Sequence, residues 1–228
     1  MKPRVIIFSI IGGLIIGTIA IVLTTIIHPV RIPSTKLISQ DVPTRGSDAT
    51  YTLTEFANYQ CSQCADYVHV LNELASEYDE HFTLAYHQVN LPTEYPLGTE
   101  AAYAAEAANL QGKFWEYSNA LYQNQSKLGP DLYIQIAEQL QLDINAFNKD
   151  KSSEAVQQRV NASTRLIGNV DTTDLPVFFF NGKRLPHMSP QELKTTVMEY
   201  IPYSPLSTST IQSLPSDNNT LQETPSTE

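Results

Sequence analysis

The sequence predicts an α/β fold in which a long helical block interrupts the strands. Three observations predict it. Strand-like runs flank a helical pattern near residue 60, helical patterns alone occupy residues from about 98 to 164, and a hairpin with a closing helix follows. This order indicates one domain over residues 50–203, with a helical insertion over about residues 91–166. A chain of this length can bury an ordinary hydrophobic core.

The domain opens with a strand, a pair of cysteines and a helix. Residues 51–56 alternate apolar and polar side chains in the manner of a β-strand. Cys61 and Cys64 follow this run. Beyond them, apolar residues recur at helical spacing, at Ala65, Val68, Leu71, Leu74, Ala75 and Tyr78. The cysteines therefore stand at a junction between a strand and a helix.

The second strand and the helical block come next. Residues 82–89 alternate in strand fashion until Asn90, Leu91 and Pro92 break the pattern. Alanine, the best helix former, is frequent over residues 101–110, and residues 133–140 and 153–166 also show helical spacing. The block is too long for a simple crossover, so we expect an inserted helical subdomain.

The domain closes with a hairpin and a helix. The apolar run over residues 175–180 is followed by Asn181-Gly182 and then by residues 183–185. Asn-Gly between two strand-like runs predicts a type I′ turn, because both central residues of that turn need positive φ. Residues 189–192 (SPQE) have the pattern of a capping box with proline at the first helical position, which predicts a closing helix.

Residues 5–27 form an apolar run without a charged side chain. At about 1.5 Å per residue, a helix of this length spans a bilayer core of about 30 Å, whereas the apolar part of a cleavable signal peptide has only about 7–15 residues. We expect an uncleaved, single-pass signal anchor in the cytoplasmic membrane. Lys2 and Arg4 favour a cytoplasmic location for residues 1–4, which leaves the cysteines outside, where a disulfide persists.

The segments on either side of the domain are polar. Residues 28–49 are expected to be a linker, and residues 204–228, rich in Ser, Thr, Pro, Asn and Gln, are expected to be a disordered tail. The chain after Lys36 carries ten basic against 24 acidic side chains. This acidic balance argues against nucleic acid as a partner.

Cys61 and Cys64 are the only cysteines of the chain, so they form either a redox pair or part of a metal site. A helix N-terminus favours a thiolate through its dipole and its free N–H groups, which supports the redox pair. A structural zinc site usually needs four nitrogen or sulfur ligands, and only His69 lies close in sequence. We therefore expect no metal, with a membrane-tethered metal-binding adaptor as the alternative.

Two further residues are expected beside the cysteines. Glu55 lies at a strand position whose side chain points under the motif, where burial raises the pKa of a carboxyl group and lets it take the proton from the second thiol. Pro176 begins a strand that the topology brings next to the cysteines, and a cis bond there presents the Leu175 backbone to a docking peptide. The alternatives are an exposed glutamate and a trans proline at an edge strand.

Three stretches resemble one known family. They are residues 54–64 (TEFANYQCSQC), 111–117 (QGKFWEY) and 175–183 (LPVFFFNGK). Over residues 42–202 the chain resembles the DsbA-like thiol:disulfide oxidoreductases, and in particular their membrane-anchored bacterial members. The resemblance implies a thioredoxin fold with an inserted helical subdomain, and no cofactor.

The resemblance also implies roles for residues and partners. Cys61 is then the exposed nucleophile, Cys64 its buried partner, Glu55 the acid beneath the disulfide and Pro176 the cis-proline. A substrate thiolate attacks the Cys61 sulfur, and a second substrate thiolate resolves the mixed disulfide. The implied substrates are reduced exported proteins, and the implied reoxidant is a quinone-linked membrane protein of the DsbB or vitamin K epoxide reductase-like type.

The chain departs from this family at its expected substrate contacts, Ser62, Gln63 and Leu175. Strong oxidants of the family usually carry Pro-His or Pro-Tyr where this chain has Ser62 and Gln63. Gln63 can donate a hydrogen bond to a Cys61 thiolate but adds no positive charge, so we expect a milder oxidant. Leu175, where Thr or Val is usual, either tightens contact with apolar substrates or shields the disulfide. A reductase or isomerase of the same fold stays open as an alternative.

Overall fold

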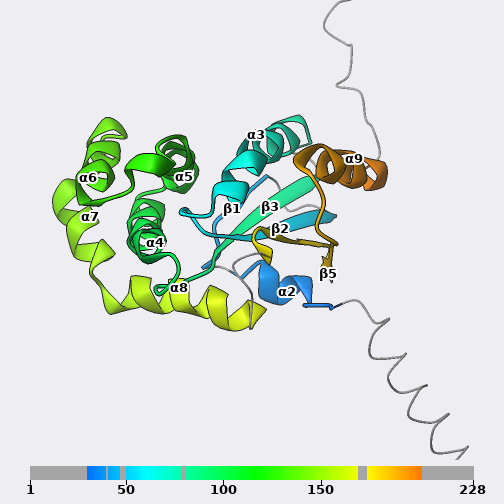
Figure 1. The fold of residues 1–228 in the computed structure, drawn as a ribbon, viewed down its shortest axis with the longest axis horizontal. Helices are drawn as coiled ribbons and strands as arrows, with labels where there is room; N and C mark the ends of the chain where they lie inside the picture. The colour runs from blue at the N-terminus through cyan, green and yellow to red at the C-terminus, as the bar shows by residue number, and fades with distance from the viewer. Residues whose placement is uncertain (1–29, 40, 47–49, 79–80, 169–173, 202–228) are drawn as a thin grey trace, which may run out of the picture.

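The computed structural model describes residues 30–39, 41–46, 50–78, 81–168 and 174–201, built around one mixed sheet (Figure 1). Its strand order is β1-β3-β2-β4-β5. Strand β2 (Tyr51–Ala57) lies parallel to β3 (Phe82–Gln88) and antiparallel to β4 (Val177–Phe180). The edges are β1 (Thr44–Arg45), antiparallel to β3, and β5 (Lys183–Arg184), antiparallel to β4.

Helices cover both faces of this sheet. Helices α3 (Ser62–Glu77) and α9 (Pro190–Tyr200) lie over one face, and α2 (Ser34–Leu37) and α8 (Glu154–Ile167) lie against the other (Figure 1). The chain between β3 and β4 is helical in its described part. It contains α4 (Pro96–Asn109), α5 (Phe114–Gln123), the 3-10 helix η1 (Gln125–Lys127), α6 (Pro130–Gln139), α7 (Ile144–Lys151) and α8.

The predicted order of elements is confirmed, and two local predictions hold in detail. Asn181 and Gly182 have φ of 46° and 77°, the two positive values that the predicted turn requires. Ser189 and Glu192 form the reciprocal capping box at the start of α9. Sequence reasoning did not delimit α5 and α7. The buried residues of α5, among them Phe114, Tyr117 and Leu121, do recur at helical spacing, whereas α7 buries only Phe147.

The expected linker over residues 28–49 is wrong for the part that the structure describes. The backbone of Arg31 forms an isolated antiparallel β-bridge with Lys183. Leu37 is fully buried, and β1 adds a strand to the edge of the sheet. The apolar side chains of Ile32, Leu37 and Ile38 pack against the core, which explains why this segment folds with the domain.

The expected anchor (residues 5–27) and tail (residues 204–228) lie outside the described residues. Within the described ranges, no helix combines the length and the hydropathy needed to cross a bilayer.

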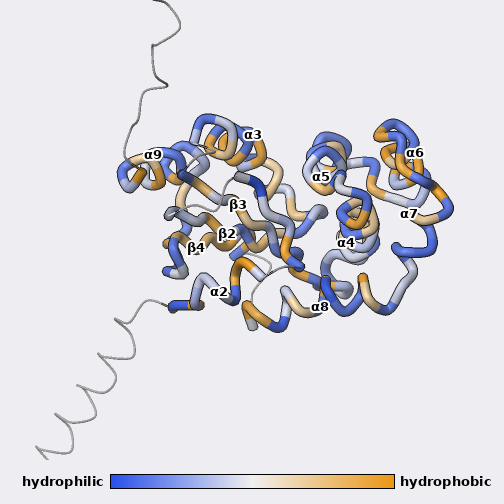
Figure 2. The backbone as a smooth tube through the Cα atoms, turned by 180° about the vertical axis from the view of Figure 1, so that it is seen from behind, coloured by the Kyte–Doolittle hydropathy of each residue, from blue (hydrophilic) through white to orange (hydrophobic). Residues whose placement is uncertain are grey.

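The core has two parts that share the sheet. One lies between the sheet and helices α3 and α9, and it includes Leu53, Leu84 and Phe178. The other extends from the sheet into the helical insertion and includes the redox cysteines. Figure 2 shows the apolar segments of the central strands and the alternation of apolar and polar residues along surface helices such as α8. The insertion and the sheet therefore share one continuous interior.

Candidate functional site

Cys61 and Cys64 form a disulfide at the N-terminus of α3, with their Cα atoms 5.4 Å apart. Cys61 is the N-cap residue, and its sulfur accepts a hydrogen bond from the Cys64 backbone N–H at 3.1 Å. The first turn of α3 contains no acidic side chain. The helix dipole and this N–H group therefore favour negative charge on the Cys61 sulfur when the disulfide opens.

The implied exposure of Cys61 is wrong for the disulfide form of the protein. The Cys61 residue is 3% exposed and Cys64 is fully buried, while Ser62 and Gln63 are exposed. The Cys61 sulfur lies 3.8 Å from the carbonyl oxygen of Leu175, so the chain that enters β4 covers it. A substrate thiolate therefore has only a narrow approach to this sulfur.

The Leu175-Pro176 peptide bond is cis, as predicted. Leu175 is fully buried in the same cluster as Cys61, so its side chain offers no surface to a substrate. Pro176 lines a groove of about 130 Å³ together with Gln63, Arg184 and His187. The structure thus brings Gln63 and Pro176 together beside the disulfide.

Glu55 lies on the face of β2 that α3 covers, opposite Tyr86 on β3 and Phe178 on β4. Its side chain lines a cavity of about 20 Å³ with Val68 and Leu71, which lie on the same face of α3 as Cys64. Glu55 is 3% exposed, and burial raises its pKa to about 8. The expectation of a buried carboxyl is confirmed, and the exposed alternative is wrong.

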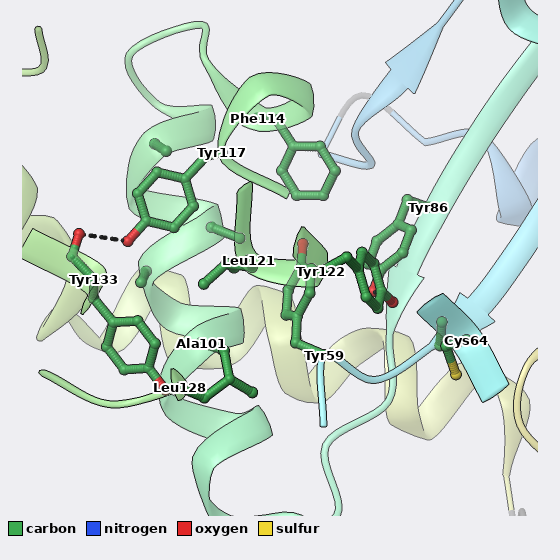
Figure 3. Packing of buried hydrophobic residues seen from close by; sticks show 14 of the residues in the cluster. Tyr59, Cys64, Tyr86, Ala101, Phe114, Tyr117, Leu121, Tyr122, Leu128 and Tyr133 are labelled. Carbon is green, nitrogen blue, oxygen red and sulfur yellow. Dashed lines mark hydrogen bonds between the residues drawn. The ribbon is translucent and has the colours of Figure 1, made fainter. Parts of the chain in front are cut away.

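Three buried tyrosines connect this region to the insertion (Figure 3). The hydroxyl groups of Tyr86 and Tyr122 are 2.8 Å apart, and the rings of Tyr59 and Tyr86 stack with centroids 5.7 Å apart. Burial raises the pKa of Tyr86 and Tyr122 well above the usual value, so both phenols stay neutral. Sequence reasoning missed these residues, because their positions in the chain follow no local pattern.

Sequence reasoning also missed Gln125, which reaches the redox pair from the insertion. Its side-chain Nε2 donates a hydrogen bond to the Cys61 carbonyl oxygen at 2.7 Å. The two residues are far apart in the chain, and no sequence motif signals a contact of this kind.

The cysteine sulfurs are bonded to each other, and His69, the nearest histidine in sequence, pairs with Glu73 at 3.3 Å on the outer side of α3. In the described part of the chain, no group of three or more His, Cys, Asp or Glu side chains is arranged to hold a metal ion. His69 is therefore a surface histidine of the helix.

The fold and the disulfide together define a class of protein, the thioredoxin-fold proteins with a Cys-x-x-Cys pair at a helix N-terminus. Residues 43–199 match the family described as Thioredoxin, and the chain belongs to that family.

Solved structures of similar fold cover most of the chain. A thioredoxin-like oxidoreductase from Silicibacter pomeroyi is 22% identical, with a TM-score of 0.62 over 74% of this chain and 97% of that chain. The thiol-disulfide exchange protein alpha-DsbA2 from Wolbachia pipientis is 16% identical, with a TM-score of 0.62 over 73% and 90%. Oxidised BdbD from Bacillus subtilis is 19% identical, with a TM-score of 0.61 over 75% and 97%. At these identities the likeness establishes the fold.

Curated relatives match the chain over a part of their own length. "Na(+)/H(+) antiporter NhaA 1" of Mycolicibacterium gilvum is 29% identical over 153 residues, which are 66% of this chain and 24% of that protein. "Na(+)/H(+) antiporter NhaA 3" of Salinispora tropica is 32% identical over 153 residues, 64% of this chain and 22% of that protein. The chain thus spans about a quarter of the length of the curated relatives that it matches.

Proposed function

We propose that this chain is an extracytoplasmic thiol:disulfide oxidoreductase that introduces disulfides into exported proteins. The observation that carries the proposal is the Cys61–Cys64 disulfide at the N-terminus of α3, where the Cys64 N–H already points at the Cys61 sulfur. The alpha-DsbA2 protein of Wolbachia pipientis is a thiol-disulfide exchange protein, which supports the same chemistry for this fold.

In the first step, a substrate thiolate attacks the Cys61 sulfur. A bond forms between the substrate sulfur and Cys61, the Cys61–Cys64 bond breaks, and Cys64 leaves with the electron pair. The buried Cys64 sulfur then takes a proton from the Glu55 carboxyl, which is protonated at neutral pH because burial raises its pKa to about 8. Glu55 recovers its proton from solvent.

In the second step, another substrate thiol loses its proton and attacks the substrate sulfur of the mixed disulfide. Cys61 leaves as a thiolate, which the α3 dipole and the Cys64 N–H stabilise. The substrate has lost two electrons and two protons, and the redox pair has gained the two electrons. A quinone-linked membrane protein of the DsbB or vitamin K epoxide reductase-like type then reoxidises the pair.

We place the domain on the extracytoplasmic side of the cytoplasmic membrane, anchored through residues 5–27. The uncharged run in the sequence supports this location. The names of the curated relatives support it as well, because an antiporter works across a membrane.

A reductase of the same fold is the second candidate, because Ser62 and Gln63 bring no positive charge to the redox pair. Without such a charge, the Cys61 thiolate depends on N–H groups and the helix dipole alone, and a less stable thiolate makes a weaker oxidant.

The reduction potential of the detergent-solubilised full chain, measured against glutathione, separates the two candidates. We expect a potential near or above about −150 mV, and a value near the −270 mV of thioredoxin would contradict the oxidase. Cys64→Ala should trap mixed disulfides with exported proteins through Cys61, whereas the double variant C61A/C64A serves as the control and should trap none. Failure of Cys64→Ala to trap any protein would favour the alternative of a non-enzymatic, membrane-tethered metal-binding adaptor.

A further inference from the structure

The segment that ends at Cys61, residues 58–61, is bound through side-chain amides to the chain after β3 and to the insertion. Asn58 accepts a hydrogen bond from the Gln60 N–H at 2.8 Å and donates one to the Val89 carbonyl at 2.8 Å. The Gln60 side-chain oxygen accepts hydrogen bonds from the N–H groups of Leu97 and Gly98, at 3.0 and 3.1 Å, at the start of α4. The start of α4 therefore holds one side of the segment that leads to Cys61.

Gln125, on η1 of the insertion, holds the same segment at a second place. Its Nε2 donates to the Tyr59 carbonyl at 2.8 Å and to the Cys61 carbonyl at 2.7 Å. Both hydrogen atoms of one side-chain amide are thus used on the backbone that ends in the N-cap residue of α3. The insertion is in this way bonded directly to the residue that carries the reactive sulfur.

We propose that Gln125 is a positioning residue that keeps the reduced Cys61 sulfur against the N-terminus of α3 and thereby stabilises its thiolate. The inference rests on the proposed redox function. In the oxidised protein the covalent bond to Cys64 already fixes the Cys61 sulfur. In the reduced protein that bond is gone, so hydrogen bonds and the packing around Cys61 have to keep the sulfur within reach of the Cys64 N–H.

Removal of Gln125 should weaken the position of Cys61 only in part, because one local hydrogen bond of Cys61 does not involve Gln125. The Cys61 N–H donates to the Asn58 carbonyl at 3.0 Å, and this turn does not involve the insertion. Loss of Gln125 removes two of the hydrogen bonds that hold the segment. These bonds are present in the disulfide form as well, so only the part of their contribution that differs between the two redox states counts, and we expect a change of roughly three- to tenfold in the balance between the reduced and oxidised forms.

The test is Gln125→Met, which keeps the length of the side chain and removes the donor. With the full chain in detergent, the equilibrium with glutathione should shift roughly three- to tenfold toward the disulfide, about 15 to 30 mV, since tenfold corresponds to 29.6 mV. The ultraviolet titration of the Cys61 thiolate should move to higher pH. Gln123→Met, at the exposed end of α5, is the matched control and should change neither.

Equal equilibrium constants for Q125M and the native chain, with the native chain redox-active, would overturn the positioning role and leave the proposed function standing. A native chain that exchanges no disulfide with glutathione would instead contradict the proposed function. If Q125M does not fold, the native protein decides by NMR. Slow solvent exchange of the Gln125 side-chain protons in the reduced state is expected, and fast exchange there would refute the role.

Discussion

At the scale of single residues, the buried Glu55 makes the stability of the domain depend on pH. Burial raises its pKa from 4.5 to about 8, so between these values the folded protein holds a proton that the unfolded chain has lost. The free energy of unfolding therefore falls as pH rises through this window, by at most about 1.4 kcal/mol per pH unit. Below pH 4.5 both states are protonated, and the loss is complete above pH 8.

Glu55→Gln should flatten this slope, because the amide is neutral at every pH in the window. We expect the difference to be clearest between pH 7 and 8, since Glu106, whose pKa burial raises to about 7, contributes below that range. Urea unfolding at both pH values measures it, with exposed Glu138→Gln as the control. If Glu55 is the proton donor that we propose for Cys64, the variant should also exchange disulfides roughly a hundredfold more slowly. An unchanged slope would show that Glu55 is ionised in the folded protein.

At the scale of elements, local signals made the elements around the redox pair predictable. A few adjacent residues determine the turn at Asn181 and Gly182, and a few others determine the capping box of α9. Strand β1 and helix α2 are too short to carry a periodic pattern. Strand β1 forms through its antiparallel pairing with β3, and helix α2 forms where the core buries Leu37. The burial of Cys61 could not be predicted either, because it depends on a contact with Leu175, more than a hundred residues later in the chain.

The docking of the segment that precedes α2 depends on Gly182. Its φ is 77°, and an added Cβ would lie 2.4 Å from the Ile32 carbonyl oxygen, while the Ile32 N–H donates to the Gly182 carbonyl at 2.9 Å. Gly182→Ala should lose about 1–2 kcal/mol from the positive φ and more from the displaced segment.

Gly112→Ala separates the two costs of that substitution. Gly112 has a φ of 72° and open space around an added Cβ, so only the backbone cost applies. Urea unfolding should rank G182A below G112A in stability, and hydrogen exchange at Ile32 should quicken in G182A alone. Equal stability of the two variants would mean that the segment before α2 does not contribute to the folded domain.

At the scale of the whole molecule, the insertion and the sheet share a core. The cluster that holds the redox cysteines contains Phe56 and Tyr86 from the strands and Tyr117 and Leu121 from the insertion. Trp115, the only tryptophan, packs against both parts of the core and donates a hydrogen bond to the Thr44 carbonyl at 3.1 Å. Its fluorescence therefore reports on the contact between the insertion and the sheet edge.

We expect the insertion and the sheet to unfold in one transition, because neither can expose its side of the shared core alone. In urea, with the disulfide intact, tryptophan fluorescence and far-ultraviolet circular dichroism should give the same midpoint. Leu121→Ala, at a fully buried position, should reduce the free energy of unfolding by about 2–5 kcal/mol and lower both midpoints together. Leu110→Ala, 47% exposed at the end of α4, should leave them nearly unchanged. A loss of helical signal before the fluorescence change would show that the insertion folds separately, and Gln125 would then hold Cys61 only while the insertion is folded.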